Sequence, residues 1–515
     1  MRTYKNPILA GFYPDPSICR VGEDYYLVNS TFAYFPGVPI FHSKNLVDWE
    51  QIGHVLTRRS QVELEGCTMS GGIYAPTLRY HKGKFYMITT NVRQCGNFYV
   101  TAERPEGPWS EPIILPAEGI DPTIFFEGEK AYYLGTREKT PDISQYYGDN
   151  EIWLQELDLD KGELIGEKHV LWEGAMRGVE WPEGPHLYKI GDYYYLMIAE
   201  GGTGLNHSIT VARSKNLFGP YEGNPRNPII THRHLGKYYP IINVGHGDLV
   251  NTQNGEWWMV LLASRPYEGY CNLGRETFLV PVTWEDEWPV VNIGRGIIEE
   301  EMKVPDLPMG ERKLESTCDH FTGKILGKQW MFLRNPSEET YSLERKKGYL
   351  SLKLRPETIF GTESPSFIAR RQQHITFRMS TSLIFTPENE FEEAGIVLIQ
   401  NEKFNLRYVR CLKEGKQTLC VIQCVRGKES ILASCEVETD QIYLTVIEHG
   451  QKLEFLYGKD ENCTDRLINQ VDASFLSTEK AGGFVGTCIG MYASSNGKYS
   501  TQYAEFEWFE YLGQS

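Results

Sequence analysis

Hydrophobic residues in the first part of the chain recur as pairs of short segments joined by a glycine turn. The second segment of each pair is rich in aromatic residues, as in Tyr25-Tyr26-Leu27-Val28. Apolar and aromatic runs on both sides of a turn are typical of β-hairpins. The sequence therefore predicts five hairpins, at residues 15–28, 75–88, 121–134, 183–196 and 246–260.

These hairpins begin about 46 to 63 residues apart, which leaves room in each repeat for four short strands and long loops. Repeats of this size, built from short strands, are typical of blades arranged around an axis. We therefore expect the first part of the chain to form a five-bladed β-propeller. Long loops on one face would surround a pocket.

Three of the five hairpins start with a carboxylate, namely Asp15, Asp121 and Glu183, whereas the other two start with Ala75 and His246. Residues at equivalent points of repeats around an axis converge on that axis. A single Asp-Pro pair often does no more than open a turn. Acids at three equivalent positions instead favour a site for acid–base chemistry.

The repeat pattern stops at a polar stretch with prolines and a glycine, residues 299–310, which has the composition of a linker. Beyond it, short alternating segments such as Phe404–Val409 and Tyr443–Ile447 follow one another closely. This density of short strands indicates a β-sandwich. We predict two domains in an all-β fold: a propeller at residues 1–304 and a sandwich at residues 315–515.

Composition narrows the choice of partners. The chain has 68 acidic and 52 basic residues and a net charge of −16, which disfavours nucleic acid or an acidic membrane surface as the ligand. Aromatic residues make up 13% of the chain, which suits a β-rich fold with sugar-stacking surfaces. The sequence contains no apolar core of a signal peptide and no run of about 18 apolar residues. We therefore expect a cytoplasmic protein that binds a neutral ligand.

Motifs spread over nearly the whole chain occur in a characteristic order. They are Asn6-Pro7-Ile8-Leu9, Gly11-Phe12-Tyr13-Pro14-Asp15-Pro16, Glu183-Gly184-Pro185-His186-Leu187, Leu273-Gly274-Arg275-Glu276-Thr277 and Phe367-Ile368-Ala369-Arg370-Arg371-Gln372. Together they resemble glycoside hydrolase family 43. The resemblance is to its branch of β-xylosidases and α-L-arabinofuranosidases that carry a C-terminal concanavalin-like domain.

The resemblance implies a five-bladed propeller that carries an inverting glycosidase and requires no cofactor. At the matching positions, Asp15 is the general base, Glu183 is the general acid, and Asp121 orients Glu183 and tunes its pKa. The chemistry of these residues agrees, because inversion needs a base and a protonated acid roughly 6.5–9.5 Å apart to accommodate a water. A third carboxylate near Glu183 is expected to raise the pKa of Glu183 by like-charge repulsion.

Substrate contacts are also implied by the resemblance. Arg275 matches an arginine that donates hydrogen bonds to the terminal sugar, which suits a planar guanidinium with five donors. Phe32 and Tyr74 match residues that line the sugar pocket, and Phe506 matches a residue that the second domain contributes to its rim. His246 matches a histidine near the axis, beside a water or a calcium ion. A surface arginine, a structural histidine and core aromatics are the alternative interpretations.

Tyr74 departs from the related β-xylosidases, which carry tryptophan there, and this difference bears on the sugar preference. The sequence leads to the hypothesis of an exo-acting β-xylosidase that releases xylose from the non-reducing ends of xylooligosaccharides. One alternative is an α-L-arabinofuranosidase, which could act on both sugars, and another is a carbohydrate-binding propeller without turnover. We expect the second domain to shape the pocket, and we expect a homo-oligomer because related enzymes form dimers or tetramers.

Overall fold

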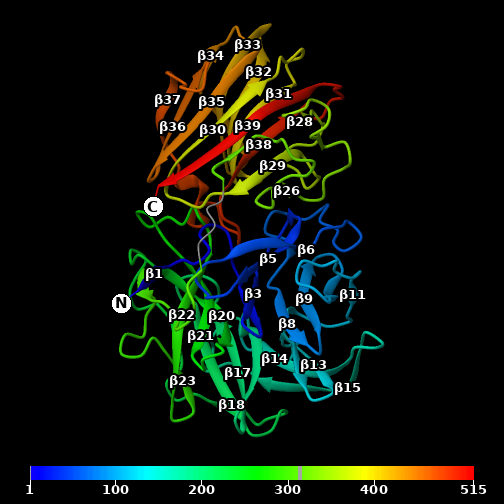
Figure 1. The fold of residues 1–515 in the computed structure, drawn as a ribbon, viewed down its shortest axis with the longest axis vertical. Helices are drawn as coiled ribbons and strands as arrows, with labels where there is room; N and C mark the ends of the chain where they lie inside the picture. The colour runs from blue at the N-terminus through cyan, green and yellow to red at the C-terminus, as the bar shows by residue number, and fades with distance from the viewer. Residues whose placement is uncertain (1, 311–315, 515) are drawn as a thin grey trace.

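The computed structural model describes residues 2–310 and 316–514, which are almost entirely β-strands and loops. Figure 1 shows the first domain, coloured blue to green, beneath the second, coloured yellow to red. The first domain contains five separate antiparallel sheets of four or five strands. Their strands are β2 (Ser17–Val21), β3 (Asp24–Val28), β5 (Gly37–Ser43) and β6 (Glu50–Leu56); β7 (Gly72–Ile73), β8 (Thr77–His81), β9 (Lys84–Val92), β10 (Gly96–Ala102) and β11 (Ile113–Ile114); β12 (Ile120–Glu127), β13 (Lys130–Glu138), β14 (Asn150–Asp158) and β15 (Glu163–Trp172); β16 (Glu183–Ile190), β17 (Tyr193–Glu200), β18 (Ser208–Ser214) and β19 (Glu222–Gly223); and β20 (Ile242–Asn251), β21 (Trp257–Ser264), β22 (Glu276–Glu285) and β23 (Trp288–Val291).

The five sheets form a closed ring. Strands β2, β8, β12, β16 and β20 contact one another in that order, and β20 contacts β2. Near the ends of the domain, β1 (Thr3–Lys5) pairs with β24 (Glu301–Lys303), so the chain leaves the propeller beside the point where it enters. The prediction of a five-bladed propeller is confirmed, with each predicted hairpin forming the inner part of one blade.

The second domain is a sandwich of two antiparallel sheets around one apolar core. One sheet contains β25 (Cys318–Asp319), β27 (Tyr341–Ser342), β28 (Leu350–Lys353), β30 (Thr376–Ile384), β35 (Gln441–His449), β36 (Lys452–Gly458), β37 (Asp465–Asp472) and β39 (Tyr503–Gln514). The other contains β4 (Tyr34–Phe35), β26 (Met331–Leu333), β29 (Ser366–Arg371), β31 (Glu393–Asn401), β32 (Phe404–Lys413), β33 (Lys416–Val425), β34 (Lys428–Glu436) and β38 (Cys488–Ser494). The prediction of a β-sandwich is confirmed. Its predicted first residue, 315, lies outside the described residues, and the exact domain boundary stays a prediction.

The two domains are joined by strand pairing and by hydrogen bonds from backbone amides. Strand β4 belongs to the propeller in sequence but pairs with β26, so the first blade extends a sheet of the sandwich. On the other side, the Cys271 amide donates to the carboxylate of Glu479, and the Thr487 amide donates to the carbonyl of Asn272. These contacts anchor a segment of the sandwich, residues 478–487, over the mouth of the propeller. The segment includes the short helix α1 (Thr478–Ala481).

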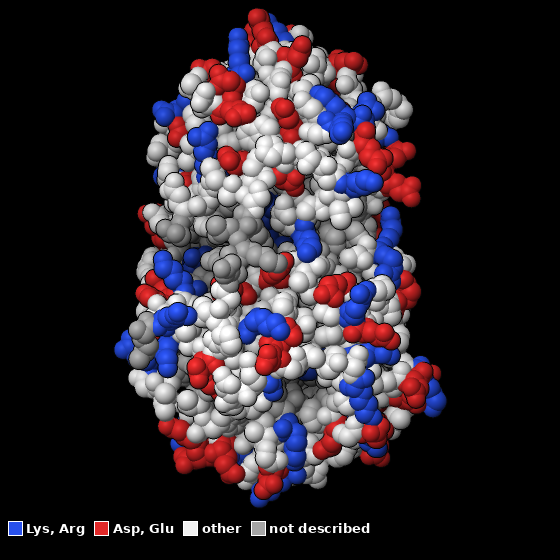
Figure 2. Space-filling view, viewed as in Figure 1, with Lys and Arg blue, Asp and Glu red and all other residues white. Residues whose placement is uncertain are grey.

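Acidic and basic side chains are interspersed over the face of the molecule in Figure 2. Within the described part of the chain, no helix has the length and apolar character needed to cross a membrane. The expectations of a homo-oligomer and of a cytoplasmic location stay predictions.

Candidate active site

An inner pocket of about 80 Å³ lies at the propeller axis, under the sandwich segment 478–487. It brings together seven of the eight residues singled out from the sequence. Its lining consists of Asp15, Phe32, Tyr74, Ala75, Ile120, Asp121, Glu183, Thr203, His207, His246, Arg275 and Phe484. The three predicted acids therefore converge although they come from three different blades.

Irregular backbone at the start of the inner strands delivers these side chains to the pocket. The pairing of β12, β16 and β20 shifts register at Asp121, Gly184 and His246, and these three residues and Asp15 have φ angles between +43° and +59°. Bulges re-aim side chains and are frequent next to active sites. Residues other than glycine rarely adopt positive φ, so this conformation is held by the surrounding structure.

Gly184 explains why the acid of the fourth blade stands one position earlier than in the first and third. A Cβ at position 184 would lie 2.8 Å from Cε1 of His246, so a larger residue would require the imidazole or the backbone to shift. The position that corresponds to Asp15 and Asp121 therefore favours glycine in this blade. Glu183 supplies the carboxylate instead, and its longer side chain reaches the same pocket.

Asp15 is buried and held by two side-chain donors. Arg275 donates from Nη1 to Oδ1 of Asp15 over 3.0 Å, and the hydroxyl of Ser30 donates to Oδ2. The same Nη1 donates to Oγ1 of Thr203 at 2.9 Å. Arg275 also donates from Nη2 to the carbonyl of Phe484 at 3.3 Å, which links the base to the second domain.

Glu183 and Asp121 both have raised pKa values. Burial is the largest cause for each, and it raises the pKa of Glu183 to about 7, with a further contribution from the negative charge of Asp15. Burial and the charge of Glu183 raise the pKa of Asp121 well above its ordinary range, whereas Arg275 lowers both values. The expected direction of the Glu183 shift is found, but its largest cause is desolvation, and the like charge that contributes is that of Asp15 rather than the expected Asp121. Such a coupled pair holds on to a proton near neutral pH.

Three aromatic rings from both domains form one wall of the inner pocket. The ring centroids of Phe32 and Tyr74 lie 5.2 Å apart, and the ring of Phe484 stacks on Phe32 at 5.9 Å and meets Tyr74 edge-on at 5.9 Å. Arg275 lies over Phe32 and Phe484. A flat apolar wall beside hydrogen-bonding groups fits a sugar ring, which has apolar faces and polar edges.

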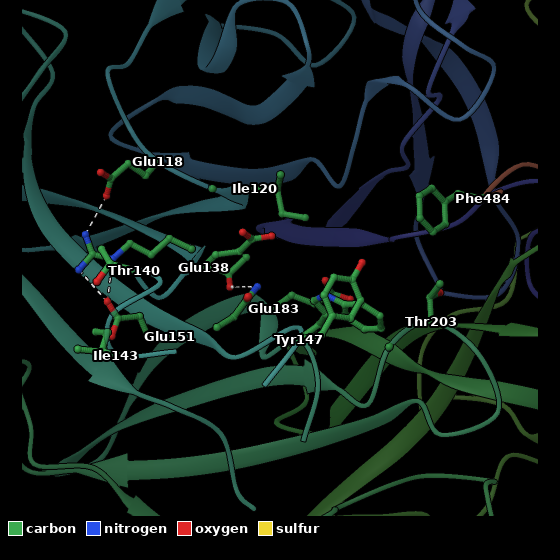
Figure 3. A pocket seen from close by; sticks show the side chains of 16 residues that line it. Glu118, Ile120, Glu138, Thr140, Ile143, Tyr147, Glu151, Glu183, Thr203 and Phe484 are labelled. Atoms are coloured by element: carbon green, nitrogen blue, oxygen red, sulfur yellow. Dashed lines mark hydrogen bonds and ion pairs between the residues drawn. The ribbon is translucent and has the colours of Figure 1, made fainter. Parts of the chain in front are cut away.

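An outer cavity of about 710 Å³ continues from the inner pocket along the third blade. The two share Ile120, Glu183, Thr203 and Phe484. In Figure 3, Glu118 and Glu151 lie on one side of Glu183, and Thr203 and Phe484 lie on the other. Glu183 is the only one of the three acids that lines both spaces, so its carboxyl lies at the boundary between them.

Comparison with known proteins agrees with this geometry. The family model described as "Glycosyl hydrolases family 43" matches residues 4–289. The model described as "Beta xylosidase C-terminal Concanavalin A-like domain" matches residues 318–512. The chain belongs to glycosyl hydrolase family 43. A "Xylosidase/arabinosidase" from Butyrivibrio fibrisolvens is 50% identical over 511 residues, which cover 98% of each chain. The protein is therefore a glycoside hydrolase with the accessory domain of its xylosidase branch.

Two further relatives of the family 43 enzyme span nearly its full length. A "Non-reducing end alpha-L-arabinofuranosidase" from Bacteroides ovatus is 40% identical over 99% of this chain and 95% of its own. A solved structure described as a xylan beta-1,4-xylosidase from Bacillus halodurans C-125 has a TM-score of 0.92 and 35% identity, covering 99% of this chain and 100% of that one. Both kinds of activity thus occur among proteins of this architecture.

The prediction that Phe506 contributes to the rim of the pocket is wrong. Phe506 is completely buried in the core of the sandwich, where it lies between Leu350 and Leu383 on neighbouring strands. The residue that the second domain contributes to the pocket of the family 43 enzyme is Phe484. Its only sequence signal is its place in a glycine-rich run, Gly482-Gly483-Phe484-Val485-Gly486, where glycines let backbones approach closely.

Thr203 and His207 were also missed from the sequence. Nothing in the sequence indicated that Thr203 would bind Arg275. His207 is buried, and it donates from Nδ1 to the carbonyl of Asn243 at 3.1 Å, with the tautomer assigned from this contact. Burial lowers the pKa of His207 to about 3, so its imidazole is neutral at the pH of most assays.

The surroundings of His246 do not fit calcium. Calcium prefers six to eight oxygen ligands, and among residues 2–310 and 316–514 no group of three or more His, Cys, Asp or Glu side chains is placed to hold a metal. The nearby carboxylates have other partners, since Asp15 binds Arg275 and Asp248 binds Arg79 at 2.8 Å. No catalytic step is therefore assigned to a metal in this enzyme.

Proposed function

We propose that this family 43 enzyme is an inverting exo-β-xylosidase that releases single xylose units from the non-reducing ends of short xylooligosaccharides. The observation that carries the proposal is the position of Glu183 between the two spaces, with Asp15 and Asp121 only in the inner one. If the glycosidic bond lies at Glu183, the terminal sugar occupies the inner pocket and the leaving group occupies the outer cavity.

The chemistry assigns a separate task to each acid. Asp15 accepts a proton from a water, whose oxygen attacks the anomeric carbon of the enclosed sugar from the face opposite the leaving group. The protonated carboxyl of Glu183 gives its proton to the glycosidic oxygen as the bond to the anomeric carbon breaks. Asp121 shares the buried pocket with Glu183, and the proximity of the two carboxyls raises the pKa of Asp121, so the pair retains a proton. One direct displacement inverts the anomeric configuration.

Closure of the inner pocket supports exo action. Phe484 closes it on the side of the sandwich, and Phe32 and Tyr74 form the wall beside Phe484. The rest of the substrate can extend from the inner pocket into the outer cavity along the third blade, because the two spaces share Glu183. A terminal sugar is therefore the expected occupant.

The first test compares p-nitrophenyl β-D-xylopyranoside, p-nitrophenyl α-L-arabinofuranoside and xylobiose. We expect the highest kcat/KM on the two xylosides, and we expect ¹H NMR of early products to show α-xylose, as inversion requires. A retained β-configuration would contradict the assigned roles of Asp15 and Glu183. Binding without turnover of any of the three would instead favour a carbohydrate-binding propeller.

An α-L-arabinofuranosidase, acting on that sugar alone or on both, is the second candidate. Tyr74 favours it, because its ring is smaller than the tryptophan of the related β-xylosidases and its phenol lies near Asp121. The names of the Butyrivibrio and Bacteroides relatives also include this activity. A dominant rate on the arabinofuranoside would replace the first candidate by this one.

A further inference from the structure

We propose that the outer cavity selects uncharged leaving groups and disfavours xylooligosaccharides that carry a uronic acid next to the cleaved bond. This inference rests on the proposed function, because it takes the outer cavity as the place of the leaving group. It concerns the charge of one wall of that cavity.

Carboxylates gather on this wall because three strand ends of the third blade meet there. Glu118 lies just before β12, Glu138 ends β13, and Glu151 lies near the start of β14. All three line the cavity. Antiparallel pairing places Glu151 opposite Arg137 and Glu138 opposite Asn150, so the acids share one edge of the sheet.

The basic groups near this wall are already engaged. Arg137 binds Glu118 at 2.8 Å and Glu151 at 2.7 Å, which occupies both ends of its guanidinium. Lys168 binds Glu118 at 3.0 Å from outside the cavity lining. Glu138 is exposed, and no cation among the described residues forms an ion pair with it. Besides Glu183, the lining therefore holds three carboxylates and one guanidinium, which leaves an excess of negative charge.

The same cavity also has aromatic residues suited to a neutral sugar. Trp181 packs on Gly202, where a Cβ would lie 2.8 Å from its ring, and it meets Tyr147 edge-on at 5.3 Å. Tyr147 is 76% exposed and lines the same cavity. A sugar can lay its apolar face on these rings while its hydroxyls point to the carboxylates. A uronate in the same place would meet like charge, and among the described residues that line the cavity the only Arg or Lys, Arg137, is already paired.

Two probes that differ only in whether one carboxyl group is free or methyl-esterified test this inference. The first is a xylotetraose with glucuronic acid on its second xylose from the non-reducing end, and the second is the methyl ester of that uronic acid. At 20 mM salt we expect kcat/KM for the ester to exceed that for the acid about 3- to 10-fold, a gap that should close at 0.5 M salt because screening weakens the repulsion. The Glu138→Gln variant should at least halve the ratio at low salt.

Glu163→Gln is the matched control, since Glu163 is exposed on the third blade but does not line the cavity. It should leave the ratio unchanged. Equal kcat/KM values for acid and ester at low salt would overturn the inference. So would an ester-to-acid ratio that does not change with salt concentration or with the Glu138→Gln substitution. Faster cleavage of the acid would mean that Arg137 binds the uronate instead.

Calorimetric binding of the same two probes to an Asp15→Ala variant separates this inference from the proposed function. Failure of wild-type enzyme to cleave neutral xylotetraose would refute the proposed function. Tighter binding of the ester than of the acid would still support the charge selection, and equal binding would refute it whatever the reaction.

Discussion

The inner pocket and the outer cavity meet at Glu183 but are built differently. The inner pocket is small, draws on all five blades and the sandwich, and holds the three acids with Arg275 and its aromatic wall. The outer cavity is much larger, draws mainly on the third blade and the adjoining loops of the fourth, and carries three further carboxylates. The inner pocket therefore determines the reaction and the sugar released, whereas the outer cavity determines what can be attached to that sugar.

This contrast predicts two classes of variants. Changes in the inner pocket should affect every substrate, including aryl glycosides. Changes in the outer cavity should depend on the leaving group. The following substitutions test the division, beginning with the largest effect.

Replacing Asp15 by alanine should reduce kcat on all substrates by about 10³-fold or more, because general-base catalysis and water positioning are lost together. Binding of xylobiose, measured by calorimetry, should persist. A variant that keeps a tenth of wild-type turnover would show that Asp15 is not the base, and near-ultraviolet circular dichroism would establish that the variant is folded.

Replacing Glu183 by glutamine should separate substrates by leaving group. Xylobiose, whose leaving sugar needs a proton, should lose about 10³-fold in kcat, and p-nitrophenyl xyloside, whose phenolate leaves readily, should lose far less. In the wild type, kcat/KM should fall as pH rises through about 7, because the acid must be protonated and burial raises its pKa to about 7. This alkaline limb should disappear in the variant. Equal losses on both substrates would contradict the assignment of Glu183.

The Asp121→Asn variant tests how far the two neighbouring acids in the buried pocket lower the free energy of unfolding. Asp121 has a folded-state pKa well above its ordinary value, so the folded state binds a proton that the unfolded state releases above about pH 4. Stability of the wild type should therefore fall as pH rises from 5 to 8, and the variant should lose less. Activity should drop about 100-fold. If Tm depends on pH in the same way in both proteins, Asp121 does not cause the loss of stability.

The parts of the fold that repeat were predictable from the sequence. Each hairpin carries its own turn and aromatic strand, so local residues identify the blades, and ring closure brings Asp15, Asp121 and Glu183 together. The parts that depend on docking between distant segments were not predictable. Phe484 follows no periodic pattern, and its position depends on contacts such as that of Glu479 with the Cys271 amide.

Phe506 shows how a matched motif can mislead. Within β39, Ala504 and Phe506 are buried while Glu505 and Glu507 are less so, which is the period of two expected of a strand with one face in the core. The alternation already pointed Phe506 into the sandwich. The resemblance of a short segment nevertheless led to the prediction that Phe506 lies at the rim of the pocket.

Paired substitutions at Phe484 and Phe506 sharpen the distinction between pocket and core. Phe484→Ala should raise KM for all substrates, lowering kcat/KM about 10-fold through lost stacking, with little change in stability. Phe506→Ala should cost about 3–5 kcal/mol in the free energy of unfolding but leave KM of the folded enzyme unchanged. Denaturant melts and initial rates distinguish the two. A raised KM in Phe506→Ala alone would restore the original assignment.

The smallest expected effect concerns the sugar preference within the inner pocket. In Tyr74→Trp, the larger indole extends the apolar wall under a six-membered pyranose ring more than under a furanose, so the ratio of xyloside to arabinofuranoside kcat/KM should rise about 3-fold. Tyr74→Phe keeps the ring size and removes only the hydroxyl near Asp121, which makes it the matched control. If ring size determines the preference, Tyr74→Phe should leave the ratio of xyloside to arabinofuranoside kcat/KM near the wild-type value. If both variants shift it equally, the hydroxyl rather than the wall discriminates between the sugars.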